Sequence, residues 1–293
     1  MTAIIQAVVD ALYVGSLYAL YALGVAMIFG IMRLINFAHA SLIAAGAYAL
    51  AVTTGLPLVL RIVIAIAVCV ALALLLELVA FRGLRRADPA TLLVTSFAVY
   101  ITLTALSEAV FGSLPMASPM NDWFQQSWVA GNLYLPTING LTLIVTAVLL
   151  IGLSLFLART RWGVQMRAAA EDFTTARLLG VRANRVIMLA FALSGILAAA
   201  AAILLVGAVG TVTPTFGIVP VLFGLIAAVV GGLSSLRGAV LGGFVVGITS
   251  QLLQYLLPQD LRPFRDAFLF AAVFLLLVFR PQGLISPKQG ERI

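Results

Sequence analysis

The sequence predicts an all-α membrane protein, a polytopic transmembrane helical bundle of about 8–10 crossings with broken helices near the centre. Its 293 residues are 63% hydrophobic and only 9% charged, with a mean hydropathy of +1.17. Soluble domains are about half apolar and about a quarter charged. So little polar surface could not cover a water-soluble fold of this length. The excess apolar surface must therefore face lipid.

The apolar runs give the order of the crossings, because spanning about 30 Å of hydrocarbon takes about 20 helical residues. We treat residues 1–293 as a single transmembrane domain. The second, seventh and ninth runs are short or rich in Gly and polar residues, which leaves the exact number of crossings open. The candidate crossings are residues 5–29, 36–55, 58–80, 91–111, 139–158, 187–210, 217–234, 238–257 and 266–280.

Positive charge predicts the orientation, because Lys and Arg in short loops stay on the cytoplasmic side. Fourteen of the seventeen Lys and Arg residues fall in loops at 33, 82–86, 159–185, 237 and 280–292. We therefore expect a multi-pass protein of the bacterial inner (plasma) membrane with a cytoplasmic C-terminus. The side of the N-terminus depends on the number of crossings. The net charge of +7 lies in these loops and not on one soluble face, which argues against nucleic acid as a partner.

The first polar interruption, INFAHAS at 35–41, separates two apolar runs. Its Asn36, His39 and Ser41 would be costly against lipid, so they should face the bundle or a water-filled cavity. A second interruption, TVTPTFGIVP at 211–220, contains Pro214 and Gly217. Two interrupted segments in the two halves of a transporter indicate a translocation path. The alternative is that the polar residues only form hydrogen bonds between helices.

The longest basic loop, residues 159–186, contains a segment too polar to cross lipid. Residues 164–179 are good helix formers, so we expect one helix outside the bilayer, with Arg167 and Glu171 adjacent on one face. Gly180 can end that helix in a left-handed turn. The apolar residues near its end need either the bilayer surface or a soluble partner.

Residues that could perform chemistry are scarce. A GxxxxGK[ST] phosphate loop is absent from the sequence, and GGLSSLRG at 231–238 is better interpreted as a tight turn between helices. The single His39 has no second His with which to hold a metal, and Ser41, two positions away, faces a different side of a helix. Glu77 is close enough to Arg82 and Arg85 for a structural ion pair, which we favour over a proton relay. We expect no enzyme activity, no metal and no cofactor in this chain.

Four stretches resemble the branched-chain amino acid ABC transporter permeases of the LivH type. They are GIMRLINFAHASLIAAGAYAL at 30–50, GVQMRAAAEDFTTARLLGVRANRVI at 163–187, IAAVVGGLSSLRGAVLGG at 226–243 and FRPQGL at 279–284. The resemblance implies an importer with a second permease subunit, two ATP-binding subunits that hydrolyse the ATP, and a periplasmic solute-binding protein. It also implies that the cytoplasmic loop couples to the ATPase, through Arg167, Glu171, Asp172 and Gly180. The EAA-Gly pattern of ABC importers at large is only loosely present here, as Ala168–Glu171 followed by Gly180.

The resemblance points to branched-chain or other hydrophobic amino acids as the solute, with urea or short amides as the alternative. A further rival is a secondary transporter driven by an ion gradient, which would need carboxylates within the membrane. Glu77 and Glu108 are poor candidates for that role, because both lie near the ends of predicted helices. A path with few charges suits zwitterions with apolar side chains better than cationic amino acids.

Overall fold

The computed structural model describes residues 2–85, 87–120, 122–130, 133–233, 235–280 and 283–285. Helices dominate this part of the chain, with four short strands and brief 3-10 or π turns between them. The helices are α1 (Thr2–Met32), α2 (Ala38–Val52), α3 (Leu58–Leu76), α4 (Pro89–Phe111), α5 (Thr137–Arg159), α6 (Arg161–Glu171), α7 (Phe173–Leu178), α8 (Ala183–Val209), α9 (Ile218–Gly231), α10 (Leu236–Leu256) and α11 (Arg265–Phe279). The strands are β1 (Met116–Ala117), β2 (Ser127–Ala130), β3 (Leu133–Pro136) and β4 (Thr211–Val212).

The nine predicted crossings correspond in order to α1–α5 and α8–α11, which confirms the polytopic helical bundle. Six of the described helices are long and apolar enough to span a membrane. Two shorter apolar helices, α2 and α9, are each preceded by a non-helical segment, so the broken helices are also confirmed. The helix α11 has 15 residues, with Arg265 and Asp266 in its first turn.

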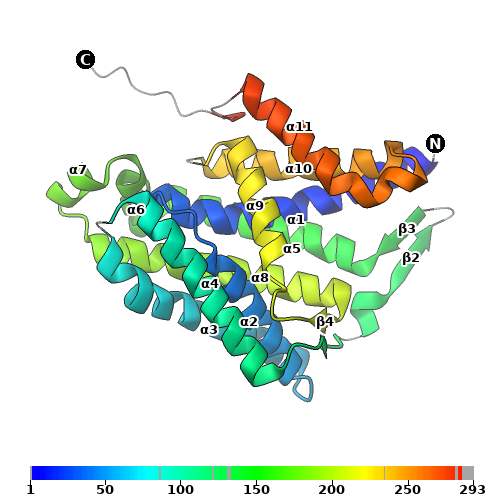
Figure 1. The fold of residues 1–293 in the computed structure, drawn as a ribbon, viewed down its shortest axis with the longest axis horizontal. Helices are drawn as coiled ribbons and strands as arrows, with labels where there is room; N and C mark the ends of the chain where they lie inside the picture. The colour runs from blue at the N-terminus through cyan, green and yellow to red at the C-terminus, as the bar shows by residue number, and fades with distance from the viewer. Residues whose placement is uncertain are drawn as a thin grey trace.

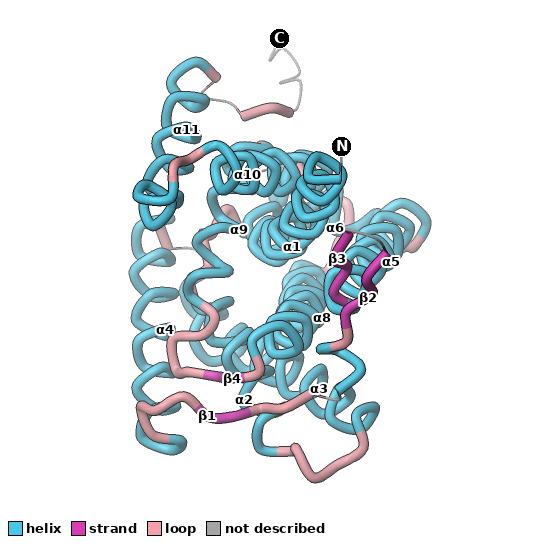
Figure 2. Tube along the Cα trace, turned by 90° about the vertical axis from the view of Figure 1, so that its right-hand side faces the viewer, coloured by secondary structure: helices cyan, strands magenta, loops and turns pink. Residues whose placement is uncertain are grey.

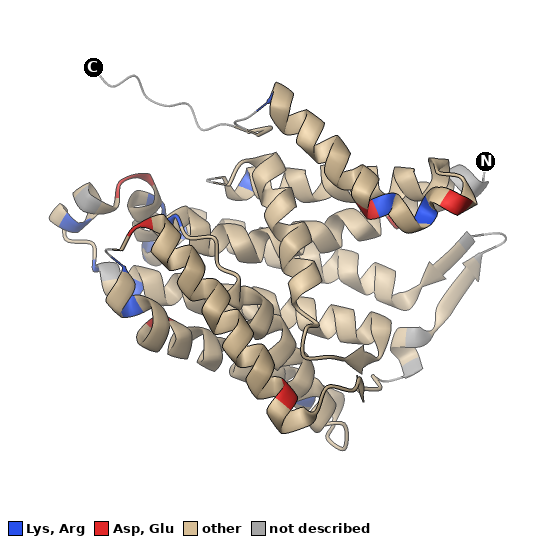
Figure 3. Ribbon diagram, viewed as in Figure 1, with Lys and Arg blue, Asp and Glu red and all other residues tan. Residues whose placement is uncertain are grey.

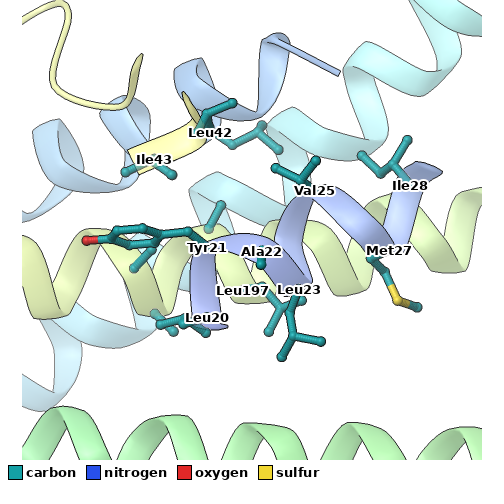
Figure 4. Packing of buried hydrophobic residues seen from close by; sticks show 14 of the residues in the cluster. Leu20, Tyr21, Ala22, Leu23, Val25, Met27, Ile28, Leu42, Ile43 and Leu197 are labelled. Atoms are coloured by element: carbon teal, nitrogen blue, oxygen red, sulfur yellow. The ribbon is translucent and has the colours of Figure 1, made fainter. Parts of the chain in front are cut away.

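The helix α1 forms the centre of the bundle, with α8, α9 and α10 around it (Figures 1 and 2). Leu20, Leu23 and Ile28 of α1 are less than 2% exposed, and they belong to the same buried cluster as Leu42 of α2 and Leu197 of α8 (Figure 4). By contrast, α4 lies at the periphery and leaves most of its surface exposed. An apolar helix with that much exposed surface is suited to lipid or to another membrane helix.

Small residues allow the helices around α1 to approach closely. A methyl group added to Gly243 of α10 would overlap Ala19 of α1, and one added to Gly247 would overlap Gly15. These residues lie four apart on both helices, which is the small-xxx-small spacing of close helix pairs in membranes. The residues 232–235 connect α9 to α10 in a tight turn, as the sequence predicts for GGLSSLRG; Ser234 lies outside the described residues.

The four strands lie at the end of the bundle that holds the N-terminus of α1. Strand β1 pairs with β4, and β2 pairs with β3 in an antiparallel hairpin. The Gln6 side chain anchors the hairpin to α1, because its Nε2 donates to the Tyr134 carbonyl oxygen at 2.9 Å and its Oε1 accepts from the Tyr134 N–H at 3.0 Å. The hairpin protrudes beyond the helices in Figure 1.

Basic residues gather at the opposite end of the bundle, which we call the arginine-rich end (Figure 3). It is formed by the ends of α1, α3 and α5, by α6 and α7, and by the turn between α9 and α10. The backbone N–H of Leu284 donates to the Val230 carbonyl oxygen at 2.8 Å, so the chain after α11 returns to this same end. Arg86, Lys288 and Arg292, which also support the predicted orientation, lie outside the described residues.

Candidate translocation site and coupling segment

The first break is the non-helical segment of residues 33–37, between α1 and α2. Its backbone polar groups need partners, because lipid supplies none. The Ser96 hydroxyl of α4 accepts from the Phe37 N–H at 3.2 Å and lies 3.1 Å from the Ile35 carbonyl oxygen. The Oδ1 atom of Asn36 accepts from the Ala38 N–H at 3.1 Å, at the start of α2. Side chains therefore supply hydrogen-bond partners to the backbone of this break at Ile35, Phe37 and Ala38.

The second break is residues 210–217, between α8 and α9. Gly210 ends α8 in the left-handed conformation, with φ of 72°. The next residues, Thr211 and Val212, form β4 and pair with β1, and the Ser118 N–H donates to the Gly210 carbonyl oxygen at 2.9 Å. Pro214 is buried and lacks an N–H that would need a partner. Backbone pairing therefore supplies hydrogen-bond partners at this break, while Gly210 allows the turn and Pro214 has no N–H that needs a partner.

The two breaks meet inside the bundle. Gly217, at the start of α9, packs so closely on the first turn of α2 that a methyl group there would overlap the carbonyl oxygen of Ala40. Asn36 of the first break is 2% exposed, and His39 and Ser41 in the first turn of α2 are 1% and 6% exposed. The structure thus brings Gly217 of the second break against α2 at Ala40, between His39 and Ser41 in the sequence.

His39 faces α1 and α8. Its Nδ1 lies 3.0 Å from the Ser194 Oγ of α8, and its ring contacts Gly24 so closely that a methyl group there would overlap it. The Ser41 hydroxyl and the Asn36 Nδ2 have no hydrogen-bond partner in the described part of the chain. The single His39 therefore takes a part in helix packing, while Asn36 and Ser41 keep free polar groups. Within the described residues, no three potential metal ligands come together.

Sequence reasoning missed Ser96 and Ser194, the two serines that bond the first break and His39. Each lies in the middle of an apolar run, and its partner is 59 or more positions away. The sequence holds no signal that separates Ser96 from Ser107, whose hydroxyl bonds the Leu103 carbonyl of its own helix.

The expectation of one helix over 164–179 is wrong, because the segment divides into α6 and α7 at Asp172. The Asp172 carboxylate accepts from the Thr175 N–H at 3.1 Å and from the Thr175 hydroxyl at 2.5 Å, so it caps α7. The predicted left-handed end at Gly180 is present, with φ of 90°. The Val181 N–H donates to the Ala176 carbonyl oxygen at 3.0 Å across this turn.

The two helices of this segment differ in their surroundings. The buried residues Gly163, Met166 and Ala169 hold α6 against the bundle. Leu178 and Leu179, at the end of α7, are 83% and 81% exposed. Arg167, Glu171, Asp172 and Gly180 are all exposed. The segment therefore combines a docked helix with a protruding apolar tip.

The predicted ion pair of Glu77 is confirmed, with Arg85 as its partner. Glu77 is fully buried in a π turn that continues α3, and the Arg85 Nη1 also donates to the Asn184 Oδ1 of α8 at 2.5 Å. Burial lowers the pKa of the Arg85 guanidinium from its ordinary value. The pair ties α3 to α8 at the arginine-rich end, which is a structural role and leaves no free carboxylate for a proton relay.

A many-helix bundle whose two interrupted helices meet at its centre, with a helical segment protruding at one end, is the architecture of a transport permease. The family described as branched-chain amino acid transport system, permease component, matches residues 7–278. The chain therefore belongs to this family. It is a permease component of an ABC transport system, not an enzyme, and ATP hydrolysis takes place in partner subunits.

Individual relatives are similar over nearly the whole chain. The high-affinity branched-chain amino acid transport permease BraD of Pseudomonas aeruginosa is 32% identical, over 99% of this chain and 98% of BraD. The corresponding LivH protein of Escherichia coli K12 is 31% identical, over 99% and 97%. A chain in the solved structure of PsaBC from Streptococcus pneumoniae in complex with Fab has a TM-score of 0.50, with 16% identity and coverage of 96% and 92%. That last likeness concerns the fold alone.

Proposed function

We propose that this chain is one permease subunit of an importer that carries branched-chain and similar apolar amino acids into the bacterial cytoplasm. The observation that carries the proposal is the meeting of the two breaks at Gly217 and Ala40, in a core whose buried polar groups are nearly all neutral. The buried charged residues of the described core, Arg61 and Glu77, lie at the ends of their helices.

The arrangement suits a zwitterion with an apolar side chain. The N-termini of α2 and α9 begin next to the breaks, and the positive end of a helix stabilises a carboxylate. Asn36 and Ser41 offer polar atoms without internal partners, while Pro214 and Gly217 belong to the second break, which contacts α2 at Ala40. A cationic side chain would find no carboxylate there to replace its hydration. The names of BraD and LivH agree with this class of solute.

The complete importer consists, in our proposal, of this single-domain chain, a second permease subunit, two ATP-binding subunits and a periplasmic solute-binding protein. Membership of the family supports the existence of such partners. The arginine-rich end faces the cytoplasm, because basic loops stay on that side. Since Arg280 follows α11 at this end, the C-terminus is cytoplasmic and the hairpin of β2 and β3 is periplasmic.

The coupling segment, residues 159–186, binds an ATPase subunit through α7. Leu178 and Leu179 form its exposed apolar tip, and Arg177 and Arg182 flank that tip. An apolar tip with charged neighbours fits a groove on a soluble partner. The contact with the ATPase also involves the exposed side chains of Arg167 and Glu171. Asp172 and Gly180 contribute by setting the start and the end of α7.

Uptake into proteoliposomes tests the solute. The complete complex is reconstituted, ATP is enclosed, and leucine, urea and lysine are compared, each supplied by a suitable binding protein. We expect ATP-dependent leucine uptake at least about tenfold faster than lysine uptake, a difference of about 1.4 kcal/mol. Equal rates for lysine and leucine would contradict the proposal, and uptake of urea alone would replace the amino acid by a short amide.

Substitutions in α7 test the coupling segment. Leu178→Asp with Leu179→Asp removes the apolar tip, and Glu171→Arg with Asp172→Arg reverses the charge at the junction of α6 and α7. Both pairs should weaken co-purification with the ATPase or lower the solute moved per ATP. Leu114→Asp is the matched control, because Leu114 is 80% exposed and lies in the loop after α4, near β1 and away from this segment. Unchanged assembly and uptake in both double variants would refute the assignment.

A further inference from the structure

Arg33, at the start of the first break, has an unusual backbone conformation. Its φ is 54°, and among the described residues it is the one non-glycine residue with a positive φ. The left-handed conformation costs a non-glycine residue about 1–2 kcal/mol, and five glycines adopt positive φ elsewhere in this chain. A glycine at position 33 would avoid this cost, but it would also lose the contacts of the arginine side chain.

The side chain of Arg33 reaches α6. Its Nη2 donates to the Ala170 carbonyl oxygen at 3.4 Å, and Ala170 lies in the last turn of α6. The last carbonyl groups of a helix lack partners within the helix, and a cation there also interacts favourably with the helix dipole. The backbone of Arg33 is held separately, because its N–H donates to the Phe29 carbonyl oxygen at 2.8 Å.

Arg33 thus lies between the coupling segment and the first break. On one side, α6 is followed directly by the Asp172 junction and α7. On the other side, residues 34–37, which include Asn36, connect Arg33 to the N-terminus of α2. The distance of 3.4 Å is at the long end for a hydrogen bond, where a small shift of α6 would strengthen or break it.

We propose that Arg33 is a positioning residue for transport, which links the movement of α6 and α7 to the first break. This inference rests on the proposed function, in which α7 binds the ATPase. In an importer of this kind, the bundle alternates between an arrangement open to the periplasm and one open to the cytoplasm. The bond between Arg33 and Ala170 is stronger in one of these arrangements than in the other. This difference in the free energy of the bond biases the position of residues 34–37. The equilibrium between the two arrangements changes by about two- to tenfold, which is the effect of one ordinary hydrogen bond.

Three substitutions separate the backbone of Arg33 from its side chain. Arg33→Gly keeps the left-handed conformation and loses the link, Arg33→Ala loses the link and keeps the backbone strain, and Arg33→Lys keeps a cationic donor. Each is placed in the complete importer in a Cys69→Ser background that also has Ile35→Cys, because Ile35 is a partly exposed residue of the first break. The measurements are co-purification with the ATPase, the rate of ATP hydrolysis, and the rate at which the introduced thiol at position 35 reacts with a small polar reagent, with and without ATP.

With Arg33 present, we expect ATP to change the reaction rate of the thiol at position 35. Arg33→Gly should keep assembly and hydrolysis but reduce this ATP-dependent change by about two- to tenfold, and Arg33→Lys should retain more of it. Arg33→Ala should uncouple like Arg33→Gly and in addition melt at a lower temperature than Arg33→Gly.

The outcomes distinguish this inference from the proposed function. Suppose that the importer with Arg33 assembles with an ATPase and hydrolyses ATP, and that ATP changes the reaction rate of the thiol at position 35 equally with Arg33 and with Arg33→Gly. The link through Arg33 is then refuted, and the assignment of the coupling segment stands. The same holds if the thiol at position 35 never responds to ATP. If the chain with Arg33 binds no ATPase, the proposed function and this inference both fail. If Arg33→Gly alone loses the ATPase, Arg33 is needed for assembly and the positioning role is refuted.

Discussion

The two breaks do the same task by different means: each separates a long spanning helix, α1 or α8, from the short apolar helix that follows it, α2 or α9. Side chains bond much of the first break: Ser96 bonds the backbone at positions 35 and 37, and Asn36 accepts from the Ala38 N–H at the start of α2. The second break uses Gly210, Pro214 and the pairing of β4 with β1. A segment held by a few side-chain hydrogen bonds can exchange them at small cost, whereas Gly, Pro and strand pairing fix the backbone itself. The first break is therefore the adjustable one, and it is also the one that contacts α6.

The largest effect should come from the point where the breaks touch. Gly217→Ala places a methyl group against the backbone of Ala40, and backbone cannot move aside as a side chain can. We expect a loss of about 3 kcal/mol in stability, the upper end for an overpacked core, and no uptake. The measurement is the melting temperature of the purified protein, followed by transport. Gly152→Ala on α5 is the control, because nothing lies within 4 Å of its added methyl group; equal melting of the two variants would refute the contact.

A second prediction tests whether side chains really hold the first break. Ser96→Ala leaves the Phe37 N–H and the Ile35 carbonyl oxygen without that partner, inside the bundle. Leaving a buried polar group unsatisfied costs about 1–3 kcal/mol, and we expect a corresponding fall in melting temperature. Ser107→Ala removes a bond within α4 and should melt like the wild type. If Ser96→Ala also melts like the wild type, the backbone of the first break is satisfied in another way.

The third prediction concerns the second break and should have a smaller effect. Gly210→Ala forces a side chain into the left-handed region at φ of 72° and should lower stability by about 1 kcal/mol. Gly210→Asn should lose less, because Asn tolerates this conformation better. Thermal melting of both variants checks the order. An equal or larger loss with Asn would mean that space at this position, and not backbone conformation, is what requires glycine.

Much of the fold was predictable, because membrane helices leave direct signals in composition. The order of the long apolar helices and the positions of both breaks follow from hydropathy and from the placement of Gly, Pro and polar residues. The Glu77 and Arg85 pair was also predictable, since a carboxylate in an apolar helix needs a nearby cation. These features depend on the chain's own local sequence.

The features that sequence reasoning missed depend on distant partners or on a single local conformation. Ser96 finds Phe37 across 59 positions, and no pattern marks it among the other hydroxyl residues of α4. Arg33 has no glycine-like signature, so its positive φ could not be foreseen. The division at Asp172 did have a signal, because Asp followed three positions later by Thr is a capping pattern. The strong helix formers on either side of Asp172 concealed it.

The smallest expected effect is a pH dependence of stability at the start of α4, the helix whose Ser96 bonds the first break. Asp88 caps α4, and its carboxylate accepts from the Thr91 N–H at 2.9 Å and from the Thr91 hydroxyl at 3.1 Å. These hydrogen bonds hold the pKa of Asp88 below its ordinary value. Because the folded pKa is depressed, the stabilisation is present above about pH 4, the ordinary pKa of Asp, and is lost as the pH falls through the folded pKa.

Asp88→Asn keeps a capping oxygen but cannot ionise, so it separates the cap from its charge. We expect the wild type to melt slightly higher than Asp88→Asn at pH 6, and the two to converge as the pH falls below about 4. Melting between about pH 3 and pH 7 is the measurement, with Asp260→Asn, at the start of the turn before α11, as a control for the loss of one carboxylate. The accessibility of a cysteine introduced at position 35 should rise with the loss of the Asp88 charge, while that of one introduced at position 215 should not change. A rise at both positions would mean that the two breaks loosen together, and the contrast between an adjustable first break and a fixed second break would be lost.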